Sequence, residues 1–246
     1  MIPTAITTFS PEYYESWGRE ALASMVKYWP GKIVAYYERD RPTDWTGKHS
    51  PVEYRDLFDQ PELANFVKWT SMVPLCQGIL PNGEYHYHFD AHKFGRKVFA
   101  ITDYALERKP FFFLGADTRC IKPIPVEFLS GLLEGRPGAF LLRRHLDTHV
   151  ESDFAGYNMD DPVMLKMLEK YRGAFTNGAF LEMHGWHDCV ALDKLLDLFE
   201  ITDKVNNISK DIKGEGALGL HVWPNTVLAE YMVHLKGNMK KGKEAA

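Results

Sequence analysis

The sequence predicts an α/β protein in which helices flank a mostly parallel central sheet. Apolar and β-branched runs of strand length alternate with segments whose apolar residues recur every three or four positions, the period of a helix that packs one face against a sheet. The first 38 residues contain a strand, a helix and a second strand in that order. A helix between two strands allows the strands to pair in parallel, so the order of the elements predicts the class.

The amino-terminal half begins with a strand at residues 4–10 and continues into a helix. Ser10 can cap this helix, and Pro11 can occupy its first position. A second strand follows at residues 32–38. Residues 39–60 are polar and rich in turn-forming residues, so we expect them to form a surface excursion.

Later segments continue the alternation. A helix with apolar residues from Phe94 to Ala105 leads into an apolar run at residues 111–114, and a further strand is expected at residues 139–144. The periodicity predicts helices at residues 162–171, 188–199 and 226–235.

Composition and charge indicate a globular chain with no general affinity for polyanions. The 246 residues are 45% hydrophobic and 25% charged, which suits one domain spanning residues 1–246. The net charge of −4 gives no overall attraction to nucleic acid or to an anionic membrane, although residues 236–246 form a basic tail. The three cysteines show no C-x-x-C spacing, and neither a signal peptide nor a membrane span is recognisable. We therefore expect reduced thiols and a cytoplasmic protein, with the oligomeric state left open.

The stretch FFFLGADTRCIKPIP, residues 111–125, runs from a buried strand directly into Asp117. Ligands of open parallel sheets bind at the carboxyl ends of the strands. The same edge receives Thr7, Thr8 and Glu38 from the first two strands. Asp117 therefore lies where a binding site is expected, although an aspartate after a strand also commonly closes a local turn.

This stretch resembles the strand-to-loop segment of the GT-A-fold glycosyltransferases, in which a D-x-D pair ends an apolar strand and a K-P-[IL]-P run follows. The resemblance implies a Rossmann-like GT-A architecture and a divalent ion, Mn²⁺ or Mg²⁺, that neutralises the diphosphate of a nucleotide-sugar donor. Ala116 and Asp117 match the motif and are expected to contact the donor or the ion, whereas Gly115 replaces the first acidic residue. The site is then either weaker in metal affinity or completed by another residue.

A second motif lies near the end of the chain, where HLKGNMK spans His234 to Lys240. It is similar to the H-x-x-G-x-x-K motif of the glycogenin-like glycosyltransferases, although the Pro-Trp that follows it in that family is absent. The resemblance implies that His234 is a metal ligand, that Gly237 allows close approach to the diphosphate and that Lys240 pairs with phosphate. A helix end with solvated lysines is the structural alternative.

The layout of that family implies further contacts. Thr7 and Thr8 are expected beside the nucleotide base and ribose, with Glu38 nearby. Lys97 lies on the helix that precedes the metal strand and is expected to reach phosphate or sugar, unless it belongs only to the exposed flank of that helix.

Two aspartates are the expected catalytic residues. Asp188 opens a predicted helix, where its carboxylate can orient the transferred sugar or act as general base toward the acceptor, but can equally cap the helix. Asp160 precedes another predicted helix and is expected to face the sugar, unless it or Asp161 caps that helix.

Two alternative functions stay open. The segment YHYHFDAH puts His86, His88 and Asp90 on one face if it forms a strand, which suits a metal-dependent hydrolase. Gly115 makes a catalytically inactive, nucleotide-sugar-binding GT-A relative conceivable. The sequence contains no P-loop, dinucleotide-binding or serine-hydrolase motif.

We therefore predict a metal-dependent glycosyltransferase that moves a sugar from a nucleotide-sugar, with a UDP-sugar as the expected donor, to an acceptor hydroxyl. The length fits a small bacterial or phage enzyme. The acceptor is a glycan, a protein or a hydroxymethylated DNA base, and the acidic net charge argues against a broad DNA-binding face. The transferred sugar and the anomeric outcome stay open.

Overall fold

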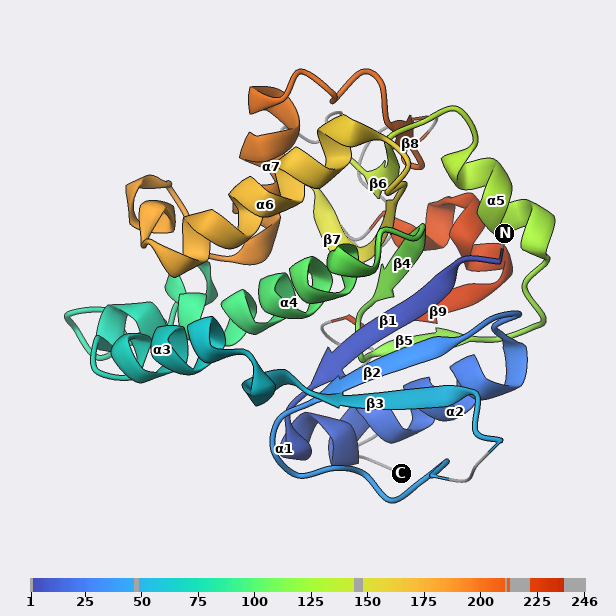
Figure 1. The fold of residues 1–246 in the computed structure, drawn as a ribbon. Helices are drawn as coiled ribbons and strands as arrows, with labels where there is room; N and C mark the ends of the chain where they lie inside the picture. Colours follow the sequence, from blue (N-terminus) through green and yellow to red (C-terminus); the bar gives the residue numbers. More distant parts are fainter. Residues whose placement is uncertain (1, 47–48, 144–147, 211, 213–221, 237–246) are drawn as a thin grey trace.

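A computed structural model describes residues 2–46, 49–143, 148–210, 212 and 222–236. Among these residues, seven strands form one sheet in the order β3-β2-β1-β4-β7-β6-β8 (Figure 1). The strand β7 runs antiparallel to its neighbours β4 and β6, and the other pairs in the sheet are parallel. The expected mostly parallel sheet is therefore confirmed. The strands are β1 (Thr4–Phe9), β2 (Ile33–Tyr37), β3 (Val52–Asp56), β4 (Phe111–Leu114), β6 (Gly138–Leu141), β7 (Glu151–Tyr157) and β8 (Asn206–Asn207).

Helices cover both faces of the sheet (Figure 1). All four residues of β4 are apolar, and successive side chains of a strand point to opposite faces of the sheet. Both faces therefore need to be covered. Phe111 and Phe113 pack into the core beneath one set of helices, and Phe112 and Leu114 pack into the core on the other side. The first set comprises α3 (Pro61–Thr70), α4 (Ala91–Tyr104), α6 (Pro162–Thr176) and α7 (Asp188–Leu198), and the second comprises α2 (Arg19–Tyr28) and α5 (Val126–Leu133).

Short side-chain caps fix where several helices begin. Ser10 accepts a hydrogen bond from the Tyr13 N–H at 3.2 Å at the start of α1 (Pro11–Tyr13), as expected. A π-helical turn, Tyr14–Gly18, joins α1 to α2. Asp161 caps α6 by accepting from the Val163 N–H at 2.8 Å. In the described part of the chain, the 3₁₀ turns are Leu57–Asp59, Pro74–Gln77, Tyr87–Phe89, Ala105–Glu107, Ala179–Glu182, Trp223–Asn225 and Val227–Glu230.

Two expectations about the fold were wrong. Residues 39–60 do not form only a surface excursion, because residues 52–56 are the edge strand β3, paired in parallel with β2. Residues 226–235 do not form a helix. They contain a 3₁₀ turn followed by β9 (Met232–His234), because this segment pairs with a short strand elsewhere in the chain.

That pairing forms a two-stranded antiparallel ribbon of β5 (Thr118–Cys120) and β9. Thr118 lies opposite His234, and the Leu235 N–H donates to the Asp117 carbonyl at 3.1 Å. The ribbon therefore carries the end of the described chain to the carboxyl end of β4. Within the described ranges, no helix has both the length and the apolar character needed to cross a bilayer.

Candidate metal and donor site

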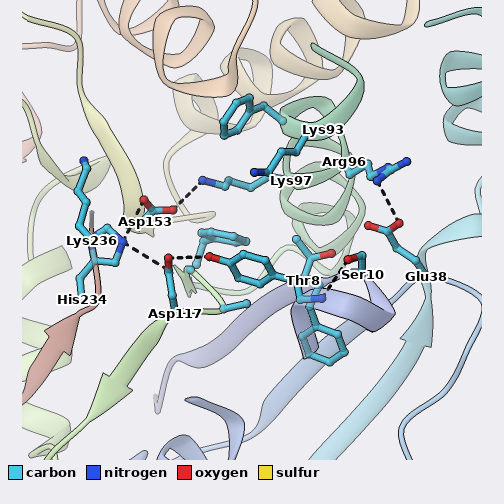
Figure 2. Close-up of a pocket in the computed structure, with 16 residues that line it drawn as sticks. Thr8, Ser10, Glu38, Lys93, Arg96, Lys97, Asp117, Asp153, His234 and Lys236 are labelled. Atoms are coloured by element: carbon cyan, nitrogen blue, oxygen red, sulfur yellow. Dashed lines mark hydrogen bonds and ion pairs between the residues drawn. The ribbon is translucent and has the colours of Figure 1, made fainter. Parts of the chain in front are cut away.

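Three side chains from distant parts of the sequence meet at the carboxyl end of β4. Asp117 follows β4, Asp153 lies on β7, and His234 ends β9. The His234 Nε2 atom is 3.4 Å from Asp117 Oδ1 and 3.4 Å from Asp153 Oδ2. Figure 2 shows the imidazole directed toward both carboxylates. One ligand atom from each residue lies within 4.8 Å of the others, which is close enough for all three to bind one ion.

Asp153 occupies the space next to Gly115. The Gly115 N–H donates to the Asp153 carbonyl at 2.9 Å, so Gly115, which directly follows β4, faces Asp153 on the neighbouring strand β7. A Cβ atom at position 115 would lie 3.0 Å from Asp117 Oδ1 and 3.0 Å from Asp153 Oδ1. A carboxylate therefore reaches the position beside Asp117 from β7 instead of from the residue two positions earlier. Sequence reasoning left this role open and did not find Asp153.

The chemistry of the three side chains fits a divalent cation. Two carboxylates and one imidazole match the preferences of Mn²⁺, and carboxylate oxygens also suit Mg²⁺. The Tyr13 hydroxyl donates to Asp117 Oδ2 at 2.7 Å, which holds that carboxylate in place and leaves Oδ1 facing His234. Burial and the Asp117 charge raise the pKa of Tyr13, so its hydroxyl stays protonated and donates.

Lysine side chains compensate the acidic charge. Lys97 Nζ on α4 lies 2.8 Å from Asp153 Oδ1, 3.0 Å from Asp188 Oδ2 and 3.0 Å from Ser152 Oγ. Burial opposes the ionisation of Asp153, but Lys97, His234 and Lys236 outweigh it and hold its pKa well below the usual value. Burial likewise opposes the charge on Lys97, yet Asp153 and Asp188 raise its pKa well above the usual value.

His234 also carries a shifted pKa. Burial favours the neutral imidazole, but the charge of Asp153 and the hydrogen bond to Asp117 favour the protonated form more, and its pKa is raised. Without an ion, a proton on His234 thus takes the place of the cation between the two carboxylates.

A cavity of about 320 Å³ extends from these three residues across the ends of β1 and β2. Glu38 and Arg96 form an ion pair at 3.3 Å at its far end, and Thr8 lies between that pair and Asp117 (Figure 2). The buried Thr8 Oγ1 has no hydrogen-bond partner among the described residues. Burial raises the pKa of Glu38, and Arg96 opposes this shift. Ala116 and Lys97 also line the cavity, whereas Thr7 is buried outside its lining.

A second cavity of about 690 Å³ adjoins the first, and Lys97, Asp153 and Lys236 line both. Asp188 lines only the second cavity, where its side chain is 1% exposed and bonded to Ser152 and Lys97. It is the first residue of α7, and its neighbour His187 occupies the cap position. The helix-capping alternative for Asp188 is therefore excluded.

Other expected site residues do not join this group. Asp160 is exposed and lies in the lining of neither cavity. Gly237 and Lys240 lie outside the described residues. Lys236, which is described, lines both cavities, and its Nζ lies 2.5 Å from Glu151.

The local structure does not support the metal group on which the hydrolase alternative depends. His86 precedes the 3₁₀ turn Tyr87–Phe89 and His88 lies within it, so the two histidines do not share one face of a strand. The Asp90 carboxylate caps α4 through the Lys93 N–H at 3.0 Å and accepts from the Tyr85 hydroxyl at 3.0 Å. Among the described residues these three form no metal-capable group.

Comparisons with known proteins identify the fold. No protein-family model and no curated protein matches the sequence. Core-mannan synthase A from Aspergillus fumigatus, solved in its Mn/GDP form, superposes with a TM-score of 0.50 at 11% identity, over 83% of this chain and 72% of that one. Mouse xyloside xylosyltransferase 1 gives a TM-score of 0.43 at 12% identity over 83% of both chains. The glycosyltransferase GlyE from Streptococcus pneumoniae gives 0.46 at 13% identity, and the match spans 83% of this chain and 44% of GlyE.

The sheet order and the similarity to core-mannan synthase A define a GT-A-like fold. At 11% identity that similarity establishes the architecture alone. The chemistry assigned to this chain must therefore come from its own residues.

Proposed function

We propose that this protein is a metal-dependent glycosyltransferase that uses a nucleotide-sugar donor. The observation that carries this proposal is the convergence of Asp117, Asp153 and His234 at one end of a cavity of about 320 Å³. In open parallel sheets, this edge is where nucleotides bind. Core-mannan synthase A, which shares the fold, was solved with Mn and GDP, and this supports the same class of ligands here.

Asp117, Asp153 and His234 would hold Mn²⁺ or Mg²⁺. When bound, the ion supplies positive charge that stabilises the nucleoside diphosphate as it leaves the sugar. Tyr13 keeps Asp117 oriented through its hydroxyl, and Lys97 does the same for Asp153. Lys236 lines the cavity beside Asp153 and can donate to a phosphate oxygen, a role that the sequence motif implied for Lys240.

The nucleoside lies, in this proposal, between the metal site and the Glu38–Arg96 pair. Thr8 is well placed to receive it, because a ligand atom would satisfy the buried hydroxyl that has no partner among the described residues. Glu38 forms an ion pair with Arg96, and its carboxylate retains acceptor capacity for a ribose hydroxyl or a base N–H. UDP is the nucleotide that we expect. Thr7, the buried neighbour of Thr8 in β1, would hold Thr8 in position.

The transferred sugar and the acceptor occupy the second cavity, which begins where Lys97, Asp153 and Lys236 line both spaces. Asp188 acts there by holding Lys97 at 3.0 Å, which makes it a positioning residue. An ion-paired carboxylate is a weak base, so a direct role as general base is less favoured. The acceptor remains a glycan, a protein or a hydroxymethylated DNA base.

An inactive nucleotide-sugar-binding relative is the second candidate. Its motivation was Gly115, which replaces the first acidic residue of the motif. Asp153 supplies a carboxylate at that place, so the substitution does not deprive the site of a ligand.

Turnover of donors tests the proposal. The protein is incubated with a panel of nucleotide-sugars and Mn²⁺, and release of nucleoside diphosphate is followed with and without a mixture of acceptors. We expect release from one donor, its loss in EDTA and its loss in Asp153→Asn. Stabilisation by a donor without any release would support the inactive relative, and the absence of both would contradict the whole assignment.

A further inference from the structure

A second group of metal-capable side chains lies in the wall of the larger cavity. His149, His187 and Cys189 each offer one ligand atom, and these atoms lie within 4.8 Å of one another. The group shares no residue with the Asp117, Asp153 and His234 site. It also differs in chemistry, because it contains two imidazoles and a thiol and no carboxylate.

Two structural elements bring these residues together. His187 is the cap residue of α7, and Cys189 is in the first turn of that helix. His149 precedes β7, and this segment is tied to α7 because the Val150 N–H donates to Asp193 Oδ1 at 3.1 Å. The rings of His149 and His187 have centroids 4.6 Å apart, and the His88 ring lies 5.2 Å from that of His187.

The imidazole of His187 points to a missing ligand. His187 is 3% exposed, and its buried Nε2 atom has no hydrogen-bond partner among the described residues. A buried polar atom without a partner costs free energy, so such atoms commonly mark an absent water or ion.

The charges around the group also tolerate a cation. The lining of the larger cavity contains four carboxylates, Glu151, Asp153, Asp188 and Asp193, against three basic side chains, Lys97, Arg143 and Lys236. A divalent ion bound with the Cys189 thiolate adds one net positive charge, which offsets this acidic excess.

We propose that His149, His187 and Cys189 form a second metal site, specific for Zn²⁺ or a similarly thiophilic divalent ion. Imidazole and thiolate ligands favour zinc, whereas Mn²⁺ and Mg²⁺ favour oxygen. Tetrahedral zinc holds nitrogen and sulfur ligands about 3.3–3.6 Å apart, and the three ligand atoms lie within 4.8 Å of one another, so small side-chain movements bring them to that spacing. His88, which lines the same cavity, or water would supply a fourth ligand. Such an ion joins the segment before β7 to the start of α7.

Cobalt spectroscopy on the untagged chain tests this site without relying on activity. Co²⁺ bound by a thiolate gives a sulfur-to-metal charge-transfer band, which an oxygen and nitrogen site cannot give. We expect the band in the wild-type protein and in Asp153→Asn, in which the first site is damaged. We expect it to disappear in Cys189→Ser and to persist in the matched control Cys120→Ala. Zn²⁺ added afterwards should displace the cobalt and abolish the band.

A histidine variant adds a second measurement. His149→Gln should weaken Zn²⁺ binding by more than about 100-fold, because even groups behind the ligands are typically worth about 10–100-fold. Circular dichroism confirms that each variant is folded. The proposal is overturned if the folded wild-type protein shows no charge-transfer band, if Cys189→Ser retains the band, or if His149→Gln binds Zn²⁺ as tightly as the wild type. Because Asp153→Asn removes the site proposed for catalysis, failure of the proposed function leaves these outcomes unchanged.

Discussion

Asp153 faces Gly115 across the pairing of β7 with β4, and its carboxylate fills the place that a side chain at position 115 would take. A D-x-D motif supplies both carboxylates from one segment, whereas here Asp117 follows β4 and Asp153 lies on β7. Gly115 provides the space, and Asp153 provides the charge.

An exchange of these two residues should move the carboxylate without losing the site. Asp153→Gly alone should weaken Mn²⁺ binding by more than about 100-fold. The double variant Gly115→Asp/Asp153→Gly should recover part of that loss, because the Cβ atom of the new aspartate lies 3.0 Å from Asp117 Oδ1 and its carboxylate can reach the same site. Isothermal titration measures the affinities. The control Gly115→Ala/Asp153→Gly carries no carboxylate and should recover nothing, so equal affinity of the two double variants would refute the exchange.

The pH dependence should have opposite signs for metal binding and for metal-free stability. The raised pKa of His234 means that its ion pairs contribute stability fully below the unfolded-state pKa of about 6.5, and that this contribution is lost as the pH rises through the folded-state pKa. Metal binding requires the neutral ring, so Mn²⁺ affinity should rise with pH through the same window. Titrations from about pH 6 upward measure both. In His234→Asn the two slopes should vanish, and unchanged slopes would show that another group titrates.

Removal of the Lys97 charge should strongly destabilise the metal-free protein. Lys97→Met leaves the Asp188 carboxylate buried, at 1% exposure, without its lysine partner. Breaking a buried pair in this way costs about 3–5 kcal/mol of unfolding free energy. Urea denaturation measures the change, and Lys93→Met, an exposed residue one turn earlier on α4, should change stability by less than about 0.5 kcal/mol.

The double variant Lys97→Met/Asp188→Asn gives the matching test. Removal of both charges should restore part of the lost stability, because no unpaired carboxylate remains at position 188. If the loss of unfolding free energy in the double variant equals the sum of the losses in the two single variants, the two side chains are not coupled.

Asp188 and Asp160 should differ sharply in their effects on turnover. Asp188→Asn loosens Lys97, and a displacement of about 1 Å at a reacting centre costs about 100-fold in rate. The loss should fall on kcat, with little change in KM for the donor, because Asp188 lines only the second cavity. Asp160→Asn should leave both constants unchanged, since Asp160 is exposed and lines neither cavity. Steady-state kinetics of donor turnover measure both constants. A loss of activity in Asp160→Asn would restore Asp160 as a site residue.

The sequence indicated β1, β2 and β4 because each of these strands is an apolar run, and the helix between β1 and β2 predicted their parallel pairing. It also indicated that Asp117 and His234 belong together, through two short motifs. Asp153 was not found because its role depends on the pairing of β7 with β4, and their strand registers are set by tertiary packing across about 40 residues of chain. The local signal was the pair of acidic residues Glu151 and Asp153 in the run ESDFAGY, which otherwise forms a largely buried strand.

The end of the described chain was misassigned for a related reason. Leu228, Tyr231, Met232 and Leu235 have helical spacing, but the pairing of β9 with β5 overrides it. The β5–β9 ribbon, which forms in place of the expected helix, also brings His234 next to Asp117. A local propensity was thus overridden at the place where the site is assembled, which is where such conflicts are expected.

The central claim is that Asp117, Asp153 and His234 bind one divalent ion, which in turn binds a nucleoside diphosphate. Thermal melts of the wild-type protein and of Asp117→Asn, Asp153→Asn and His234→Asn, with UDP and other nucleoside diphosphates, with Mn²⁺ or with EDTA, test it most directly. We expect one nucleotide to raise the Tm of the wild type only when Mn²⁺ is present, and each variant to lose that increase. An equal increase in EDTA, or an increase that survives in Asp153→Asn, would contradict the account.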